Sequence, residues 1–211
     1  MNKIVIAIDS FKGCLTSEEA GIAVMKGIKT IFPDCEILLF PIADGGEGML
    51  DVLVSATQGK YRTLPAHGPL MELIQTQYGI SGDGQTALIE MAAISGLPLV
   101  PEEKRNPMLT TTYGTGELIL DALEQGCRRF IVGIGGSATN DAGLGMLQAL
   151  GFRFLDKRGN LLGTGGKIMS QVASIDTSAV HPALKETRFT IACDVHNPFC
   201  GSDGAAYIFA P

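Results

Sequence analysis

The sequence has no surplus of positive charge. Its 16 Lys and Arg residues stand against 22 Asp and Glu residues, which gives a net charge of -6 at pH 7. A chain with this balance lacks the basic surface that neutralises a nucleic-acid backbone or an anionic membrane. We therefore expect a small-molecule partner, with no nucleic acid and no membrane.

The chain also lacks closely paired cysteines and long apolar runs. Its five cysteines include no CxxC pair, and the two nearest are seven positions apart. This pattern is typical of reduced thiols. The first apolar run has five residues and ends at Asp9, too short for the core of a signal peptide, and no later run approaches a membrane span. These absences predict a cytoplasmic protein.

Two common phosphate-binding signatures are missing. The glycine-lysine pair Gly166 and Lys167 lies in a loop, but Leu161 stands where a Walker motif needs its first glycine and Ile168 where it needs Ser or Thr. The HRD and DFG signatures of protein kinases are absent as well. The sequence excludes both a P-loop and a protein-kinase site.

The first sixty residues show a β-α-β-α pattern. Short β-branched or apolar runs predict strands at Lys3–Ile8 and Glu36–Pro41. Thr16 and Glu19 form the capping box of a helix that ends near residue 33, and a second helix is expected at Met49–Ala56. We interpret residues 1–58 as the first part of a Rossmann-like (flavodoxin-like) parallel-sheet domain. Two parallel strands make a poor sheet, so we expect the rest of it beyond the chain end.

Residues 59–211 are expected to form a second, mixed α/β domain, and the sequence leaves open whether this domain is complete. Three runs separated by turn residues predict an antiparallel meander at 61–64, 72–78 and 86–90. Further strands are expected at 129–134, 152–156 and 188–193, with helices at 115–125 and about 141–150. The polar stretch 158–184 is expected to be irregular. The predicted fold class is therefore α/β, with two α/β domains.

Three loops share one composition, with glycines beside carboxylates or hydroxyls directly after a predicted strand. We call them the first loop (DSFKG, 9–13), the second loop (ADGGEG, 43–48) and the third loop (GIGGSATND, 133–141). In open α/β sheets ligands bind at the carboxyl ends of strands. Glycine lets backbone N–H groups approach phosphate oxygens, and carboxylates can hold a divalent cation. The three loops together predict a phosphate-handling site.

The third loop also permits a second interpretation. Gly133, Gly135 and Ala138 fit GxGxxA after a strand, and Asp156 lies at the end of the next predicted strand. That spacing is typical of a nicotinamide-dinucleotide-binding oxidoreductase. Against it, Asp141 places a carboxylate where a pyrophosphate should bind the helix start. Close packing of strand against helix would explain the same glycines.

Seven blocks along the chain together resemble the bacterial type I glycerate kinases. They are DSFKG, LTSEEA, PIADGGEG, ALIEMAAISGL, NPMLTTTYGTGELI, GIGGSATNDAGLGMLQALG and ACDVHNPFCG. The resemblance implies ATP-dependent phosphorylation of D-glycerate with Mg²⁺, giving 2-phosphoglycerate, in a cleft between two α/β domains. Members of that family are nearly twice this length. We therefore expect an amino-terminal part, with the activity of the chain itself and a homodimer left open.

The resemblance also implies the site residues. The catalytic candidates are Asp9, Lys12, Asp44 and Asp194. The candidates for binding substrate or nucleotide are Ser10, Gly45, Gly46, Glu47, Gly135, Gly136, Ser137, Asn140, Asp141 and Asn197. Phosphoryl transfer needs positioning and charge neutralisation, so Lys12 would offset phosphoryl or carboxylate charge. Asp44 and Asp194 would hold Mg²⁺ or accept the hydroxyl proton. The sequence leaves open which loop binds ATP and whether the 2- or the 3-hydroxyl reacts.

Overall fold

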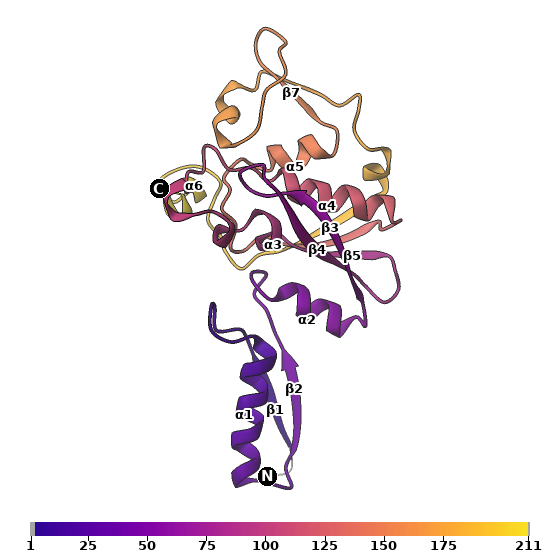
Figure 1. The fold of residues 1–211 in the computed structure, drawn as a ribbon, viewed down its shortest axis with the longest axis vertical. Helices are drawn as coiled ribbons and strands as arrows, with labels where there is room; N and C mark the ends of the chain where they lie inside the picture. The colour runs from indigo at the N-terminus through magenta and orange to yellow at the C-terminus, as the bar shows by residue number, and fades with distance from the viewer. Residues whose placement is uncertain (1–2, 211) are drawn as a thin grey trace.

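The computed structural model describes residues 3–210, which form three β-sheets with helices packed around them (Figure 1). The first sheet has two strands, the second has five and the third has two. Strands and helices alternate through much of the chain, so the predicted α/β class is confirmed.

The amino-terminal unit consists of two parallel strands and one helix. β1 (Lys3–Ile8) pairs with β2 (Glu36–Pro41), and α1 (Ser17–Ile31) lies against both strands. The Thr16 hydroxyl accepts the Glu19 N–H, and the Glu19 carboxylate accepts the Thr16 N–H. This capping box satisfies two backbone N–H groups at the helix start. Both predicted strands and the predicted capping box are confirmed.

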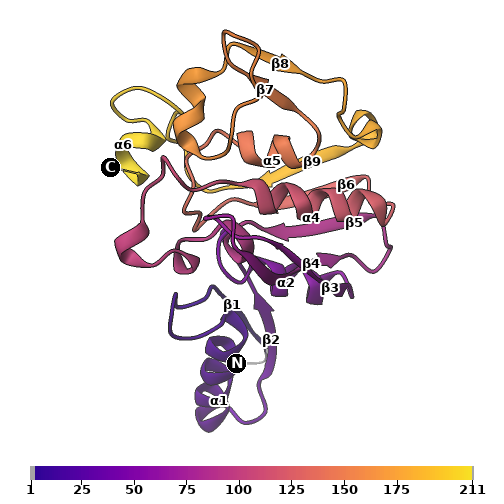
Figure 2. The same ribbon diagram turned by 45° about the horizontal axis from the view of Figure 1, so that its top comes forward.

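The large sheet has the spatial order β3-β4-β5-β6-β9 (Figure 2). β3, β4 and β5 pair antiparallel, whereas β5, β6 and β9 pair parallel. The predicted meander is therefore confirmed, and it continues into a parallel half. The strands are β3 (Lys60–His67), β4 (Leu73–Ile80), β5 (Thr86–Glu90), β6 (Arg129–Gly133) and β9 (Arg188–Ala192).

Both faces of this sheet are covered at β5 and β6. Successive side chains of a strand point to opposite faces. On β5, Ala87 and Ile89 join the core beneath α4 (Tyr113–Glu124), whereas Leu88 packs against α2 (Met49–Ala56). Burial on both faces explains why β5 is a nearly continuous apolar run.

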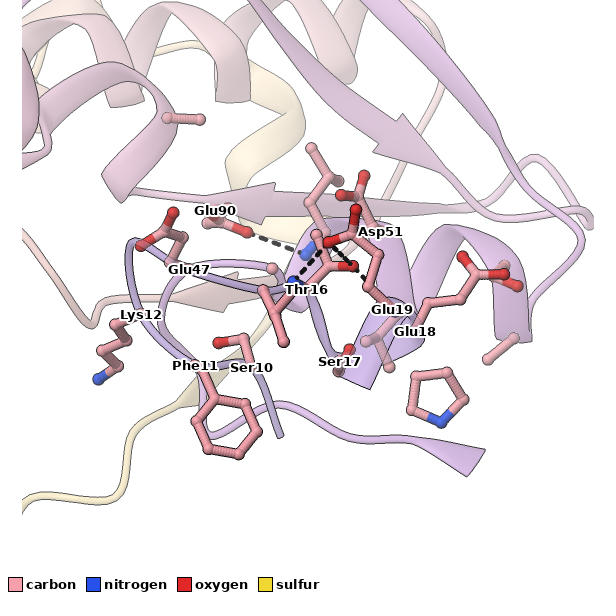
Figure 3. Close-up of a pocket in the computed structure, with 18 of the residues that line it drawn as sticks. Ser10, Phe11, Lys12, Thr16, Ser17, Glu18, Glu19, Glu47, Asp51 and Glu90 are labelled. Carbon is pink, nitrogen blue, oxygen red and sulfur yellow. Dashed lines mark hydrogen bonds between the residues drawn. The ribbon is translucent and has the colours of Figure 1, made fainter. Parts of the chain in front are cut away.

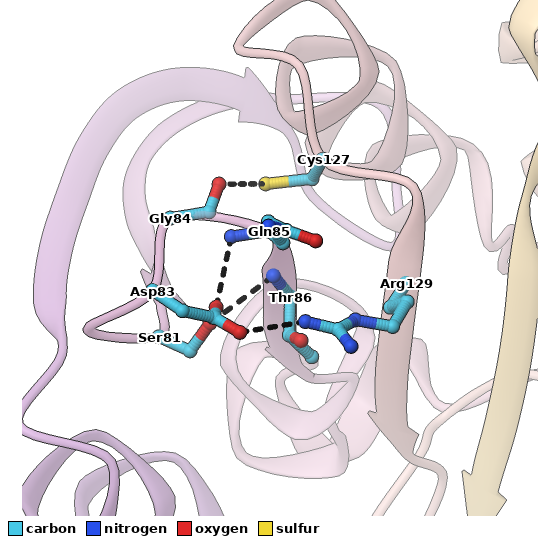
Figure 4. A network of polar contacts seen from close by, with 7 residues as sticks. All are labelled: Ser81, Asp83, Gly84, Gln85, Thr86, Cys127 and Arg129. Carbon is cyan, nitrogen blue, oxygen red and sulfur yellow. Dashed lines mark hydrogen bonds and ion pairs between the residues drawn. The ribbon is translucent and has the colours of Figure 1, made fainter.

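A polar network joins the β4–β5 turn to the start of β6 (Figure 4). The Asp83 carboxylate accepts the Ser81 hydroxyl at 2.6 Å and the Gln85 N–H at 3.0 Å, and it pairs with Arg129 at 2.6 Å. These hydrogen bonds, with the Arg129 charge, hold the pKa of Asp83 below its usual value. The network fixes the start of β5 beside the start of β6, and at the other end of this strand pair Glu90 lies opposite Gly133.

The remaining elements are short. A two-stranded antiparallel pair, β7 (Arg153–Leu155) and β8 (Ser174–Asp176), lies above α5 (Leu144–Ala149) in Figure 2. One of its strands, β8, and two 3-10 helices occupy the polar stretch that was expected to be irregular. These elements are α3 (Ala92–Ser95), η1 (Leu97–Leu99), η2 (Glu102–Lys104), α5 (Leu144–Ala149), β7 (Arg153–Leu155), η3 (Gly166–Gln171), β8 (Ser174–Asp176), η4 (Pro182–Glu186) and α6 (Ala205–Phe209).

Two features differ from expectation. The amino-terminal domain segment was expected to include α2, but in the structure α2 packs on the large sheet through Leu50 and Val54. The division of the chain at residue 58 stays a prediction. α5 begins at Leu144 instead of about residue 141, because Ala142 (φ 54°) and Gly143 (φ 72°) adopt the left-handed conformation. Within residues 3–210, no helix has the length and apolar character needed to cross a membrane.

Candidate functional site

The second and third loops meet at the carboxyl edge of the sheets. The Gly135 N–H donates to the Gly45 carbonyl at 3.1 Å, and the Ile134 N–H donates to the Ala192 carbonyl at the end of β9 at 3.3 Å. A Cβ atom on Gly45 would lie 2.6 Å from that Ala192 oxygen, and one on Gly135 would lie 2.8 Å from the Gly46 Cα. Glycine is therefore required for this approach. The expected convergence of these two loops is present.

The first loop reaches the second through one ion pair. Lys12 Nζ lies 3.5 Å from Asp44 Oδ2, and the Lys12 side chain is 69% exposed. Exposed pairs of this kind stabilise a fold by about 0–1 kcal/mol. Asp9 lies at the start of the loop, where its carboxylate accepts the Ser10 N–H at 2.6 Å. The geometry of Lys12 leaves its charge available to a ligand.

Asp44 is held in the ionised form. Its Oδ1 accepts the Gly46 N–H at 2.9 Å. That hydrogen bond, and then the nearby Lys12 charge, lower the pKa of the Asp44 carboxyl. Neither interaction closes off the carboxylate from solvent, because Asp44 remains partly exposed. It can therefore accept a cation or a proton donor at neutral pH.

A cleft of about 1070 Å³ lies between the first loop, the first turn of α1 and α2 (Figure 3). We call it the α1–α2 cleft. Of the predicted site residues, Ser10, Lys12 and Glu47 line it. Asp51, which accepts the Tyr61 hydroxyl at 2.6 Å, and Glu90 also line it. The cleft combines one lysine with several carboxylates.

Glu90 is a site residue that sequence reasoning did not assign. It is the last residue of β5, only 8% exposed, and its Oε2 accepts the Leu50 N–H at 3.0 Å. Burial raises the pKa of the Glu90 carboxyl, and the Leu50 N–H opposes that shift only in part. The signal was present, because an acid closes the run TALIE as Asp9 closes IVIAI.

The Asp141 carboxylate is buried and fully occupied by hydrogen bonds from neighbouring groups. It is 1% exposed, and its carboxylate accepts the N–H groups of Thr112 at 2.9 Å, Gly143 at 3.0 Å and Gly145 at 3.2 Å. It also accepts the Thr112 hydroxyl at 2.9 Å. The structure thus assigns this carboxylate to holding the third loop against α4 and α5.

The other members of the third loop lie apart from the α1–α2 cleft. Ser137 and Asn140 line a second, mainly apolar hollow of about 630 Å³ between α4, α5 and the strands β6 and β9. Gly136 has φ 71° and its carbonyl accepts the Leu97 N–H at 3.0 Å. The third loop therefore borders the apolar hollow, and its residues are not among those that line the α1–α2 cleft.

The candidates after β9 are exposed. Asp194 and Asn197 follow the strand end that Gly45 contacts, and the Asn197 amide donates to the Asp203 carbonyl at 3.0 Å. Among residues 3–210, no three His, Cys, Asp or Glu side chains gather as a metal site. Asp44 and Asp194 are two carboxylates. Each offers carboxylate oxygens, the ligand type that Mg²⁺ takes together with water and substrate phosphates.

The structure does not favour the dinucleotide-binding interpretation. In that fold the glycine turn opens a helix directly, but here α5 begins at Leu144, eleven residues after the end of β6 at Gly133. Asp156 follows β7, which pairs antiparallel with β8 and does not belong to the parallel sheet. Its carboxylate instead accepts the N–H groups of Arg158 at 2.8 Å and Asn160 at 2.9 Å in a turn.

Comparison with known proteins agrees with the motifs. A sequence profile described as the glycerate kinase family matches residues 4–211. The chain belongs to the glycerate kinase family. This glycerate kinase family member is 53% identical over 209 residues both to the glycerate kinase of Haemophilus influenzae and to the glycerate 2-kinase of Escherichia coli. The resemblance inferred from the sequence is confirmed, and it makes the protein a member of an enzyme family.

A solved structure supports the fold of this glycerate kinase family member. A crystal structure from Salmonella typhimurium LT2, provisionally named glycerate kinase 2, matches 100% of the chain with a TM-score of 0.88 and 47% sequence identity. The match covers 56% of that chain, and the two curated relatives are covered to 55%. The chain thus spans about half the length of the relatives it matches.

Proposed function

We propose that this chain takes part in transferring the γ-phosphoryl group of ATP to D-glycerate, giving 2-phosphoglycerate. The observation that carries the proposal is the convergence of the three loops, with Lys12, Asp44 and the glycine backbone at one edge, in a glycerate kinase family member. The 53% identity to a protein named glycerate 2-kinase favours the 2-hydroxyl as acceptor.

The residues at this edge would act by position and charge. Lys12 extends from the first loop with a largely exposed ammonium group, so it is suited to offset charge on glycerate's carboxylate or on the phosphoryl group. The tight contact between Gly45 and Gly135 fixes the second loop, which carries Asp44, against the third loop. Asp9 would hold the first loop through the Ser10 N–H.

Asp44 and Asp194 are the proposed Mg²⁺ ligands. Asp44 is held ionised by the Gly46 N–H and by Lys12, and Asp194 is exposed beside the strand end that the second loop contacts. When bound, Mg²⁺ neutralises charge on the transferred phosphoryl group and on the leaving ADP. Three further predicted residues, Ser137, Asn140 and Asn197, are proposed to contact nucleotide or substrate from the third loop and the segment after β9.

Phosphorus NMR tests this proposal directly. The chain is mixed with MgATP, with and without D-glycerate, and the full-length Escherichia coli relative serves as the positive control. We expect a phosphomonoester line that appears only with D-glycerate and has the coupling pattern of 2-phosphoglycerate. Product from the relative but none from this chain would contradict the proposed activity, and a 3-phosphoglycerate line would overturn the assigned acceptor.

A further inference from the structure

Glu90 occupies a place that the register of β5 determines. Its side chain falls on the same face as Leu88, which packs against α2, because positions two apart in a strand share a face. Glu90 therefore lies beneath the start of α2. In the parallel pair of β5 and β6 it is opposite Gly133, the first residue of the third loop. This position joins the α1–α2 cleft to the edge where the loops meet.

The two oxygens of Glu90 have different surroundings. Oε2 accepts the Leu50 N–H, and it serves as a cap for α2, whose own N-cap residue Gly48 has no side chain. Oε1 accepts no hydrogen bond that meets normal geometry within residues 3–210. Nor is Oε1 fully buried. Among the described residues, the only fully buried side-chain oxygen without a hydrogen-bond partner is that of Gln148. Oε1 therefore keeps some accessible surface, and Glu90 lines the α1–α2 cleft.

A cap alone does not need a charge. A neutral oxygen satisfies an N–H as well, whereas burying a carboxylate is unfavourable. The surroundings add to that cost: burial first, and then the charges of Asp51 and Glu47, raise the pKa of Glu90, and only the N–H groups of Leu50 and Gly48 oppose the shift. Figure 3 shows Glu47 and Asp51 beside Glu90 at the start of α2, and Lys12, on the facing loop, is the cation that lines this cleft with them. The Glu90 carboxylate thus lowers the stability of the fold, and it does so at a position that lines the cleft.

We propose that Glu90 is a catalytic residue whose Oε1 accepts the hydroxyl proton of the hydroxy acid bound in the α1–α2 cleft. This inference rests on the proposed phosphoryl transfer. As the substrate oxygen forms its bond to the γ-phosphorus of ATP, the bond from phosphorus to the bridging oxygen breaks and its electron pair leaves with ADP. The hydroxyl proton moves to Glu90 and then to solvent. A carboxylate with a raised pKa is suited to this exchange near neutral pH.

Glu90→Gln separates the cap from the charge, because glutamine retains an oxygen for the Leu50 N–H. Since the folded pKa of Glu90 is raised, the folded state binds the proton more tightly than the unfolded state. Its contribution to stability is thus full below the ordinary pKa of 4.5 and is lost as the pH rises through the folded value. We expect E90Q to unfold at higher urea than the parent chain at pH 7, with the difference closing below pH 4.5. Glu103→Gln, an exposed residue of η2, is the charge-matched control and should show no such trend.

Turnover and carboxyl NMR complete the test. General-base catalysis contributes about 10²–10⁴-fold, so E90Q should lower kcat at least a hundredfold, leave KM for D-glycerate within a few-fold, and remove the acid limb of the pH–rate profile. In the ¹³C-glutamate-labelled chain, D-glycerate should shift the Glu90 carboxyl signal and its titration midpoint, but not those of Glu103. Retained turnover in E90Q, or glycerate binding that leaves the Glu90 signal unmoved, overturns the role of Glu90. Absence of any glycerate binding to the parent chain, with binding to the Escherichia coli relative, instead overturns the proposed function and this inference with it.

Discussion

Replacing Asp141 by alanine should strongly lower the free energy of unfolding, because Asp141 holds the third loop in place. The Asp141 carboxylate is fully buried and accepts three backbone N–H groups, those of Thr112, Gly143 and Gly145, at 2.9 to 3.2 Å. The Thr112 hydroxyl, which donates to Asp141, in turn accepts the Met146 N–H at 2.9 Å. The substitution leaves these donors buried without an acceptor.

The size of the effect follows from that count. A buried donor left without a partner costs about 1–3 kcal/mol, so three of them give roughly 3–9 kcal/mol. The loop lies near the second hollow and can admit some water, so we expect a loss of about 3–5 kcal/mol. Domains unfold with a free energy of about 5–15 kcal/mol, so Asp141→Ala should come close to unfolding the chain. Asp141→Asn keeps one acceptor oxygen and should have an intermediate effect.

Urea unfolding followed by circular dichroism measures this loss. Asp156→Ala is the matched control, because the Asp156 carboxylate also accepts two backbone N–H groups, those of Arg158 and Asn160, but in a turn that water reaches. Water replaces the lost acceptor there, so the loss should be a small part of that for Asp141→Ala. Equal losses for the two variants would refute the argument that burial, and not the number of hydrogen bonds, sets the effect.

Three further outcomes are expected. Gly116→Ala should lower the urea midpoint, because a Cβ there would collide with α5. Gly27→Ala, with open space around it in α1, should raise the free energy of unfolding by about 0.5–1 kcal/mol. Equal shifts for the two variants would contradict the packing of α4 on α5. The hydrogen bond to Asp51 raises the pKa of Tyr61 to about 12, so Asp51→Asn should bring one phenolate absorbance step to lower pH, and an unchanged titration curve would count against this bond. Lys12→Met should lower kcat strongly and leave the urea midpoint nearly unchanged, since an exposed ion pair contributes about 0–1 kcal/mol; an unaltered rate would remove Lys12 from the site.

Local signals predicted a large part of the fold. The bounds of β1, β2, β5 and α2 agree with the sequence prediction to the residue. These elements are β-branched or apolar runs, or a helix closed by glycine, and their ends are marked by turn residues that lie next to them in the sequence. The sequence also predicted that the second and third loops converge, but β2 and β6 belong to different sheets, and the loops meet through the contacts of Gly45 with Gly135 and Ala192.

The contacts that determine side-chain roles were not predictable, because they join distant segments. The Glu90 carboxylate meets the Leu50 N–H across 40 positions, and Asp141 meets the Thr112 N–H across 29. No local pattern states which partner a carboxylate will find. Asp141 thus read as a ligand-binding residue, while Glu90 read as the end of a strand. The strand β8 has three residues in a polar stretch without period-two alternation, so it gave no strand signal.

The contact between the second and third loops determines how a mutational scan of this protein would be misread. Gly45, Gly133 and Gly135 leave no volume for even a methyl group, because backbone atoms of the opposite loop or of Ala192 occupy it. Every substitution at these three positions should prevent correct folding, although none of these glycines carries a reactive group. A scan scored by activity would therefore rank them beside Lys12 and Asp44. Only a second scan that measures the amount of folded protein would separate the positions that must lack a side chain from the positions whose side chains take part in the reaction.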